Sequence, residues 1–274
     1  MLALQLNRHK AMNLSGTKIY IYGRYLKLTR GLPQTVWHCK RCRGRGCKKC
    51  NYTGKVYQES VEEIIARGVS NIIPAGKIYF HGAGREDVDA LMLGNGRPFI
   101  LEICDVRLPE EEIKKLSLKT VEEEINKVGA DKIRVFNLKY TTKDNIPVIK
   151  KSSWNKKYRA VIVIGDEDKL NKQQLFRAVM SLTSTPIHQR TPTRVSHRRA
   201  DLVRLRRVYE IYIDKIENNE VTLEVTTEAG TYVKELFTGD NGRTIPSLSS
   251  LLDKKIEVKC LDVAKIFDDN TLEK

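Results

Sequence analysis

Four cysteines lie within 12 residues of one another near the start of the chain, and they constrain its fold more than any other feature. They form two C-x-x-C pairs joined by four residues: Cys39, Cys42, Cys47 and Cys50. Structural zinc takes four ligands in a tetrahedron, and one C-x-x-C turn supplies two thiolates. Two glycines let the short linker fold back. We therefore expect one closed structural zinc site. The alternatives are a metal-free loop or two half-sites completed elsewhere.

Charge predicts the partner. The chain has 274 residues, 41% of them hydrophobic, and a net charge of +15 at pH 7. Such a surface attracts polyanions, so nucleic acid is the expected partner. The sequence has no apolar run of about 18 residues that would predict a membrane span, and its first residues do not resemble a signal peptide. Cys104 and Cys260 stand alone, which indicates a reducing, cytoplasmic location rather than a disulfide framework.

We predict a division of the chain near residue 70. Residues 1–70 are expected to form an accessory remnant that depends on zinc because it has little core. Residues 71–274 are expected to form an α+β domain with a mixed, largely antiparallel sheet, since its strands meet mainly in hairpins. Strands are expected at 19–22, 77–81, 98–103, 158–164, 208–216 and 221–227, and helices after Ser60, from Thr120 and at 172–182.

A cluster of acids flanked by glycines, Gly82 to Asp89, is the first candidate for chemistry. Glycines on both sides indicate a backbone held close to a ligand. Asp87 could be a lone nucleophile or base. Alternatively Asp87, Asp89 and Glu102 could bind magnesium, as in nucleases and polymerases. A charged surface loop explains the local pattern equally well.

Residues 184–207 contain seven arginines and a single acid, Asp201. Arginine suits bidentate contacts with phosphate and stacking on bases. Pro186 and Pro192 argue against a continuous helix, so we expect an extended arm that holds RNA. A solvated basic loop is the alternative.

Two further side chains become candidates from their position. Lys234 follows Gly230, where a strand is expected to turn into a helix, so it would lie near that turn. Tyr158 precedes a buried strand and could stack on a base. The alternative for Lys234 is a surface lysine on an ordinary helix. Taken alone, Tyr158 is better explained as a sheet-edge tyrosine.

Taken together and in this order, these segments resemble the archaeal and eukaryotic "Pus ten" pseudouridine synthases. The stretch 84–89, followed by Leu-Gly-Asn-Gly-Arg-Pro-Phe at 93–99, resembles their active-site loop, and 189–201 resembles their thumb loop. The stretch 228–235 resembles a motif shared with the bacterial TruB-type enzymes. The resemblance runs from about Ile19 to Leu261.

The resemblance implies a fold, a reaction and a set of roles. A pseudouridine synthase catalytic domain would isomerise uridine 54, uridine 55 or both in the T-arm of tRNA, without a catalytic cofactor. Asp87 matches the essential aspartate, Lys234 its basic partner and Tyr158 the ring that stacks on the flipped base. Val233 and Leu261 match apolar pocket walls. Expected RNA-binding side chains also include Arg85, Arg190, Arg194, Arg198, Arg199 and Tyr232.

Members of this family usually carry a longer N-terminal part with a THUMP-like RNA-binding domain. About 38 residues precede the first cysteine here, too few for that domain. Either the domain is lost, or a separate THUMP-bearing chain supplies it as a partner, or the sequence is a piece of a longer protein. Two other functions remain to be distinguished. One is a non-catalytic zinc-containing RNA-binding protein. The other is a magnesium-dependent nuclease or nucleotidyltransferase.

Overall fold

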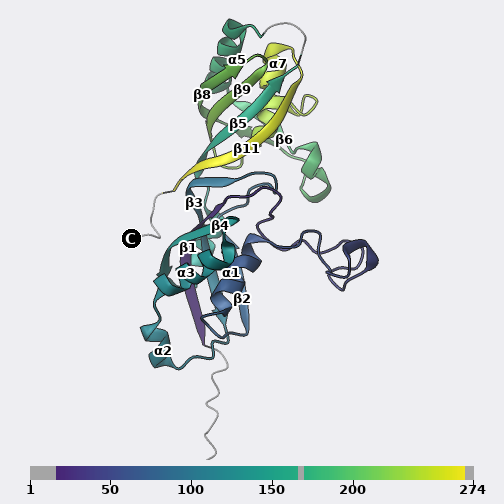
Figure 1. Cartoon of the computed structure of the whole chain (residues 1–274). Helices are drawn as coiled ribbons and strands as arrows, with labels where there is room; N and C mark the ends of the chain where they lie inside the picture. Colours follow the sequence, from purple (N-terminus) through teal and green to yellow (C-terminus); the bar gives the residue numbers. More distant parts are fainter. Residues whose placement is uncertain (1–16, 166–169, 269–274) are drawn as a thin grey trace, which may run out of the picture.

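A large mixed sheet forms the spine of the molecule in the computed structural model, which describes residues 17–165 and 170–268 (Figure 1). Its strand order is β4-β1-β3-β11-β5-β9-β8, and β2 also pairs with β3. Only the β3–β11 pair is parallel among the described pairs. The predicted α+β class with a largely antiparallel sheet is confirmed. The strands are β1 (Lys18–Lys27), β2 (Lys77–Gly82), β3 (Met92–Cys104), β4 (Ile133–Tyr140), β5 (Asn155–Ile164), β8 (Val208–Glu217), β9 (Glu220–Thr227) and β11 (Ile256–Phe267).

Helices cover this sheet, and a second, three-stranded sheet of order β10-β6-β7 carries the arginine-rich segment. The helices are α1 (Val61–Ser70), α2 (Glu110–Lys115), α3 (Leu118–Gly129), α4 (Asn145–Lys151), α5 (Lys172–Ser184), α6 (Val233–Thr238) and α7 (Leu248–Leu252). The short strands are β6 (Ile187–Arg190), β7 (Val203–Arg206) and β10 (Thr244–Ile245). No helix in the described part of the chain is long and apolar enough to cross a membrane.

Two hydrophobic cores divide the molecule into a lower and an upper half in Figure 1. The lower core lies between α1, α3 and the strands β1, β3 and β4. The upper core lies between α5, α6, α7 and the strands β5, β9 and β11. The halves meet where β11 runs beside β3, and there a Cβ on Gly94 would lie 1.8 Å from the carbonyl oxygen of Ala264. Only glycine permits this close crossing.

The predicted division at residue 70 does not separate two packed units, and this prediction is corrected. Strand β1 pairs with both β3 and β4, and α1 packs against α3. Residues 18–27 and 61–70 therefore share one core with residues from β3 and β4. They do so because their apolar faces, such as Ile64 and Ile65, are fully buried there. The segment from residue 35 to residue 58 extends away from this core (Figure 1).

Local signals predicted several elements well. The Ser60 hydroxyl accepts a hydrogen bond from the backbone N–H of Glu63 at 3.3 Å and starts α1, as expected. The predicted hairpin is the β8–β9 pair, which turns at Asn218 with φ of +52°. The helix predicted from Thr120 begins two residues earlier, capped by Ser117. Strands β4 and β11 were not predicted.

Candidate active site

Asp87 lies in the loop between β2 and β3, and a buried ion pair supports that loop from beneath. The guanidinium of Arg97 donates to the Glu86 carboxylate at 2.7 Å, and both side chains are at most 1% exposed. Arg97 also donates to the carbonyl of Ala83 at 2.8 Å, and the Tyr25 hydroxyl donates to Glu86 at 3.0 Å. These bonds tie the loop on both sides of Gly84 to β1 and β3.

Lys27 provides a second attachment for the same loop. Its side chain is fully buried, and its ammonium donates to the carbonyls of Leu32, Asp87 and Val88 at 2.9, 3.0 and 3.1 Å. Burial lowers the pKa of Lys27 below its usual value. The backbone of Asp87 is thus held by a side chain that comes from β1, the strand beside β3.

A cleft of about 1060 Å³ opens above this loop and receives side chains from both halves of the molecule. The lower half contributes the loop, and the upper half contributes Tyr158 on β5, Leu261 on β11 and the turn into α6. Val233 and Leu261 are 3% and 8% exposed, so the apolar lining is mostly buried. Nine of the predicted site residues line this cleft: Arg85, Asp87, Tyr158, Arg194, Arg199, Tyr232, Val233, Lys234 and Leu261.

Two predicted arginines are not among the residues that line it. Arg190 pairs with Asp201 at 2.7 Å and borders a separate hollow of about 480 Å³ next to β10. The side chain of Arg198 lies outside the described residues. As predicted, the arginine-rich segment does not form a continuous helix. It runs through β6, a short 3-10 turn at Thr193–Arg198 and β7.

Two cations lie near the carboxylate of Asp87. The ammonium of Lys234 is 3.6 Å from it, although the same nitrogen lies closer to Asp89, at 2.8 Å. The guanidinium of Arg194, from the 3-10 turn, is 3.3 Å from Asp87. Arg194 is itself held by Glu235 at 2.6 Å, and Glu235 is buried. Burial raises the pKa of Asp89, but the hydrogen bond from Lys234, the positive charges of Lys234 and Lys27 and a backbone hydrogen bond together leave that pKa below its usual value.

Tyr158 stands on β5 with its side chain half-buried at the cleft. Burial raises the pKa of its hydroxyl to about 12, with a smaller opposing effect of Arg97 and a further increase from Asp87. The phenol therefore carries its proton at neutral pH. Its backbone pairs with Val263 on β11 and Val225 on β9, so the residue lies on an interior strand of the sheet.

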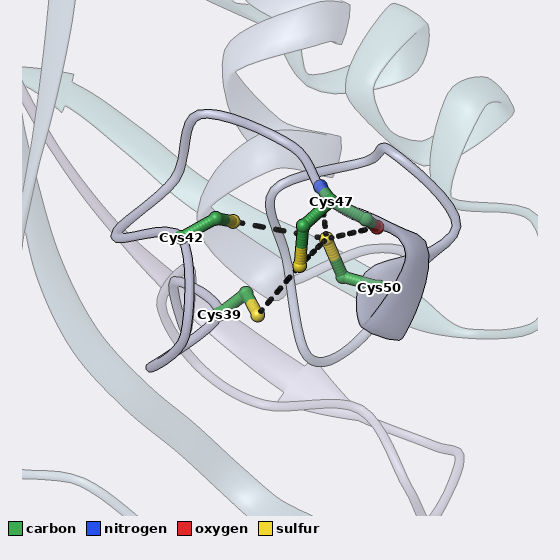
Figure 2. A group of neighbouring side chains, drawn as sticks. All are labelled: Cys39, Cys42, Cys47 and Cys50. Carbon is green, nitrogen blue, oxygen red and sulfur yellow. Dashed lines mark hydrogen bonds between the residues drawn. The ribbon is translucent and has the colours of Figure 1, made fainter.

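The four cysteines come together as the spacing predicts (Figure 2). The Sγ–Sγ distances are 4.0 Å for Cys39–Cys47, 3.8 Å for Cys42–Cys50 and 3.7 Å for Cys47–Cys50. A tetrahedron with metal–sulfur bonds of about 2.3 Å has edges of about 3.8 Å, so these thiols fit a metal ion of that kind.

Backbone N–H groups surround the same sulfurs. Gly46 donates to Cys42 at 3.2 Å, while Cys47 and Gly54 both donate to Cys50 at 3.3 Å. Burial raises the pKa of Cys50, but the N–H groups of Cys47 and Gly54 outweigh it and lower that pKa to about 6. The thiolate form that a metal requires is thus favoured at this ligand.

Comparison with known proteins identifies the family. A family model described as "Pus10, C-terminal" matches residues 20–267. The chain belongs to the Pus10 family. The "tRNA pseudouridine synthase Pus10" of Methanocaldococcus jannaschii is 46% identical over 256 residues, which cover 93% of this chain and 54% of that protein. The protein of the same name from Archaeoglobus fulgidus is 44% identical over 90% of this chain and 67% of its own length.

This Pus10-family chain spans about half the length of the first of these relatives. Among solved structures, a Cbf5-Nop10-Gar1 complex contains a chain that is similar over 89% of this chain and 48% of its own. The identity is 16% and the TM-score is 0.48.

The magnesium alternative finds no support in the Pus10-family chain. Glu102 lies on β3 and contacts Lys18 at 2.8 Å and His81 at 3.3 Å. Asp87 and Asp89 contact cations. Among the described residues, the only group of side chains arranged to hold a metal ion is the four cysteines.

Sequence reasoning missed Lys156, which also lines the cleft. Burial and, to a smaller extent, the positive charge of Arg97 lower the pKa of its ammonium to about 8. The ammonium donates to the carbonyl of Trp154 at 2.8 Å. A signal was available, because residues two apart on a strand share a face, and Lys156 precedes Tyr158 by two.

Proposed function

We propose that this chain isomerises uridine to pseudouridine in tRNA, with Asp87 as the reacting carboxylate. One observation carries the proposal. Asp87 presents a carboxylate that is 37% exposed to a cleft between two halves, on a loop tied down by a buried ion pair. The names of the family relatives, tRNA pseudouridine synthases, supply the reaction.

The reaction exchanges one glycosidic bond for another. The bond from the ribose C1′ to N1 of uracil breaks, and a bond from C1′ to C5 forms. C5 then loses its proton and N1 gains one, so the mass of the RNA is unchanged. In this proposal Asp87 attacks the ribose or removes a sugar proton, and Lys234 and Arg194 hold its carboxylate toward the cleft. The reaction needs no cofactor.

Other lining residues take supporting roles in the proposal. Tyr158 stacks on the base after it leaves the helix, and its protonated phenol donates a hydrogen bond at neutral pH. Val233 and Leu261 form the apolar wall that keeps water away from the detached base. Arg85, Arg194, Arg199 and Tyr232 contact the RNA around it.

The proposed target is uridine 54, uridine 55 or both in the T-arm, as the resemblance implies. A separate THUMP-bearing chain is a proposed partner that would help to position the tRNA. The six cysteines are all free thiols here, which fits a reducing compartment such as the cytoplasm.

The test is incubation of the purified chain with an unmodified tRNA transcript, followed by carbodiimide treatment and primer extension. We expect a new stop in the T-arm, insensitive to EDTA. Absence of that stop, with and without a THUMP-bearing partner, would contradict the proposal. RNA that is shortened in a magnesium-dependent manner would instead favour a nuclease.

We further propose that the metal in the four-cysteine site is structural zinc. Four thiolates leave no open position for a substrate, and the sulfur spacing fits a tetrahedron. Metal analysis of the purified chain should find about one zinc per chain. A stoichiometric amount of iron, or no metal at all, would contradict this assignment.

A further inference from the structure

We propose that residues 35–58, here called the cysteine lobe, form a second binding surface for the phosphate backbone of the RNA. The lobe would lie across the cleft from the arginine-rich arm. This inference rests on the proposed function only in taking RNA as the substrate. It concerns how the RNA is held and assigns no step of the reaction to the lobe.

The lobe is strongly and purely basic. Residues 35–58 contain seven basic side chains and no aspartate or glutamate. Their seven positive charges are nearly half of the chain's net charge of +15. Four thiolates and one divalent ion would contribute two negative charges, so the lobe stays positive with its metal bound. The seven are Lys40, Arg41, Arg43, Arg45, Lys48, Lys49 and Lys55.

Six of these side chains are exposed and have no ion-pair partner among the described residues. Only Lys55 pairs with an acid, Glu63 at the start of α1. Several cations elsewhere in the described residues have an acid beside them, as in Arg159 with Asp214 and Lys259 with Glu220. A cluster of unpaired like charges is unfavourable by itself, and a polyanion relieves that repulsion.

The packing of the lobe keeps these charges outside. The cysteine sulfurs occupy its centre, and the chain crosses itself so closely that a Cβ on Gly54 would lie 2.3 Å from the carbonyl oxygen of Gly44. Such a tight crossing leaves no interior for a lysine or arginine stem. Tyr52 also points outward and is 69% exposed, which adds a ring that can stack on a base.

The base of the lobe borders the loop that carries Asp87. The guanidinium of Arg85 lies 5.7 Å from the ring centre of Trp37, and Trp37 packs edge-on against Tyr57 at 5.5 Å. Gln34, just before the lobe, lines the cleft together with Arg194 and Arg199 from the arm. In the view of Figure 1, the lobe and the arm extend on the same side of the molecule.

A nucleotide that enters the cleft therefore brings its flanking backbone toward both projections. The arm would contact the strand from the upper half and the lobe from the lower half. Lysine and arginine contacts with phosphate release counterions, so they contribute affinity that falls with salt and carries little sequence preference.

The test compares two variants that remove the same number of charges. One is K40Q/R41Q/K48Q/K49Q in the lobe. The control is K115Q/K119Q/K143Q/K172Q, four exposed lysines that do not line the cleft. Affinity for a tRNA transcript is measured against salt concentration, with zinc content and melting temperature recorded for both proteins.

We expect the lobe variant to bind at least tenfold more weakly at low salt. The magnitude of its slope of log affinity against log salt concentration should be smaller by about 3. Each phosphate that one of the four removed charges no longer neutralises accounts for about 0.7–0.9 of that slope. The control should stay near the wild type. A charge-preserving variant, K40R/R41K/K48R/K49R, should restore binding. Equal affinities and slopes for the lobe variant and the control would overturn the proposal, and so would a weakening that the charge-preserving variant does not restore.

A direct measurement separates this inference from the proposed reaction. Tyr52 is replaced by photoreactive benzoylphenylalanine, and Tyr140, 49% exposed on β4, serves as the matched control. We expect RNA crosslinks from position 52 and few from position 140. Equal crosslinking from positions 52 and 140 would refute RNA binding by the lobe and favour a protein partner for that surface. If the chain crosslinks through position 52 but forms no pseudouridine, only the proposed function fails.

Discussion

The two sides of the cleft are built in different ways. On the lower side, the loop with Asp87 stands on Glu86 and Arg97, an ion pair whose side chains are at most 1% exposed. On the upper side, Arg194 and Lys234 reach Asp87 and Asp89 through ion pairs open to solvent. The Arg194 and Asp87 side chains are 38% and 37% exposed.

This difference has an energetic meaning. Breaking a buried pair leaves a charge without water or partner and costs about 3–5 kcal/mol. An exposed pair contributes about 0.2–1 kcal/mol and is screened by salt. The lower side is therefore a fixed platform for the carboxylate, whereas the ion pairs from the upper side can be broken at small cost.

The largest expected effect comes from the carboxylate on the platform. Asp87→Asn should still bind tRNA but lower turnover by at least about 10³-fold, because it removes the proposed reacting group. Single-turnover pseudouridine mapping measures this. Asp89→Asn is the control and should lower turnover much less, since Asp89 pairs only with Lys234 among the described residues. A similar loss in both variants would show that the pair, and not Asp87 alone, carries the chemistry.

The next largest expected effect is on the free energy of unfolding, which should differ between variants on the two sides of the cleft. Arg97→Met should lower the free energy of unfolding by about 3–5 kcal/mol, because Glu86 is left charged and buried. Lys234→Met, on the exposed side, should change it by less than about 1 kcal/mol. Urea denaturation measures both. Equal losses would mean that the upper side is as rigidly built as the lower one.

Arg194 tests how far the upper side depends on salt. Arg194→Met should lower kcat/KM by roughly tenfold at low salt, and the difference from wild type should shrink as salt rises. Arg194→Lys should recover only part of the lost kcat/KM, since lysine lacks the planar guanidinium whose separate N–H groups contact Glu235 and Asp87. A defect that does not vary with salt would assign Arg194 to fixed architecture.

The smallest effect is a pH dependence of binding. Lys156 has a pKa of about 8 at the cleft, so wild-type affinity for tRNA should fall a few-fold between pH 7 and pH 9 as its positive charge is lost. Lys156→Arg stays charged over this range and should remove most of that change. Identical pH profiles would show that Lys156 does not contact the RNA.

The same pKa predicts a stability effect of known sign. Lys156 is protonated in the unfolded chain up to a pH near its usual pKa of 10.5 but loses its proton near pH 8 in the fold. The unfolded state thus binds more protons between these values. The contribution of Lys156 to stability therefore rises with pH from about 8 to 10.5. Lys156→Met should lack that rise in urea denaturation.

Local features were readable from the sequence. The C-x-x-C spacing brings four sulfurs to tetrahedral distances, and Ser60 starts a helix, because these outcomes depend on residues close in the chain. The β8–β9 hairpin follows from its alternating residues and short turn in the same way. The division at residue 70 failed because the apolar face of β1 is satisfied only by β3 and β4, far along the chain.

The groups that could make up a site are visible in the amino-acid sequence: an acid loop between glycines, an arginine-rich arm and a cysteine cluster. Which of these groups meet depends on how the chain folds. Strand β11 had to lie between β3 and β5 before Leu261 and Tyr158 could line the same cleft, and the arm had to reach across the cleft before Arg194 could approach Asp87. The physical reason is that strand pairing and burial join residues over a hundred positions apart, which local spacing does not specify.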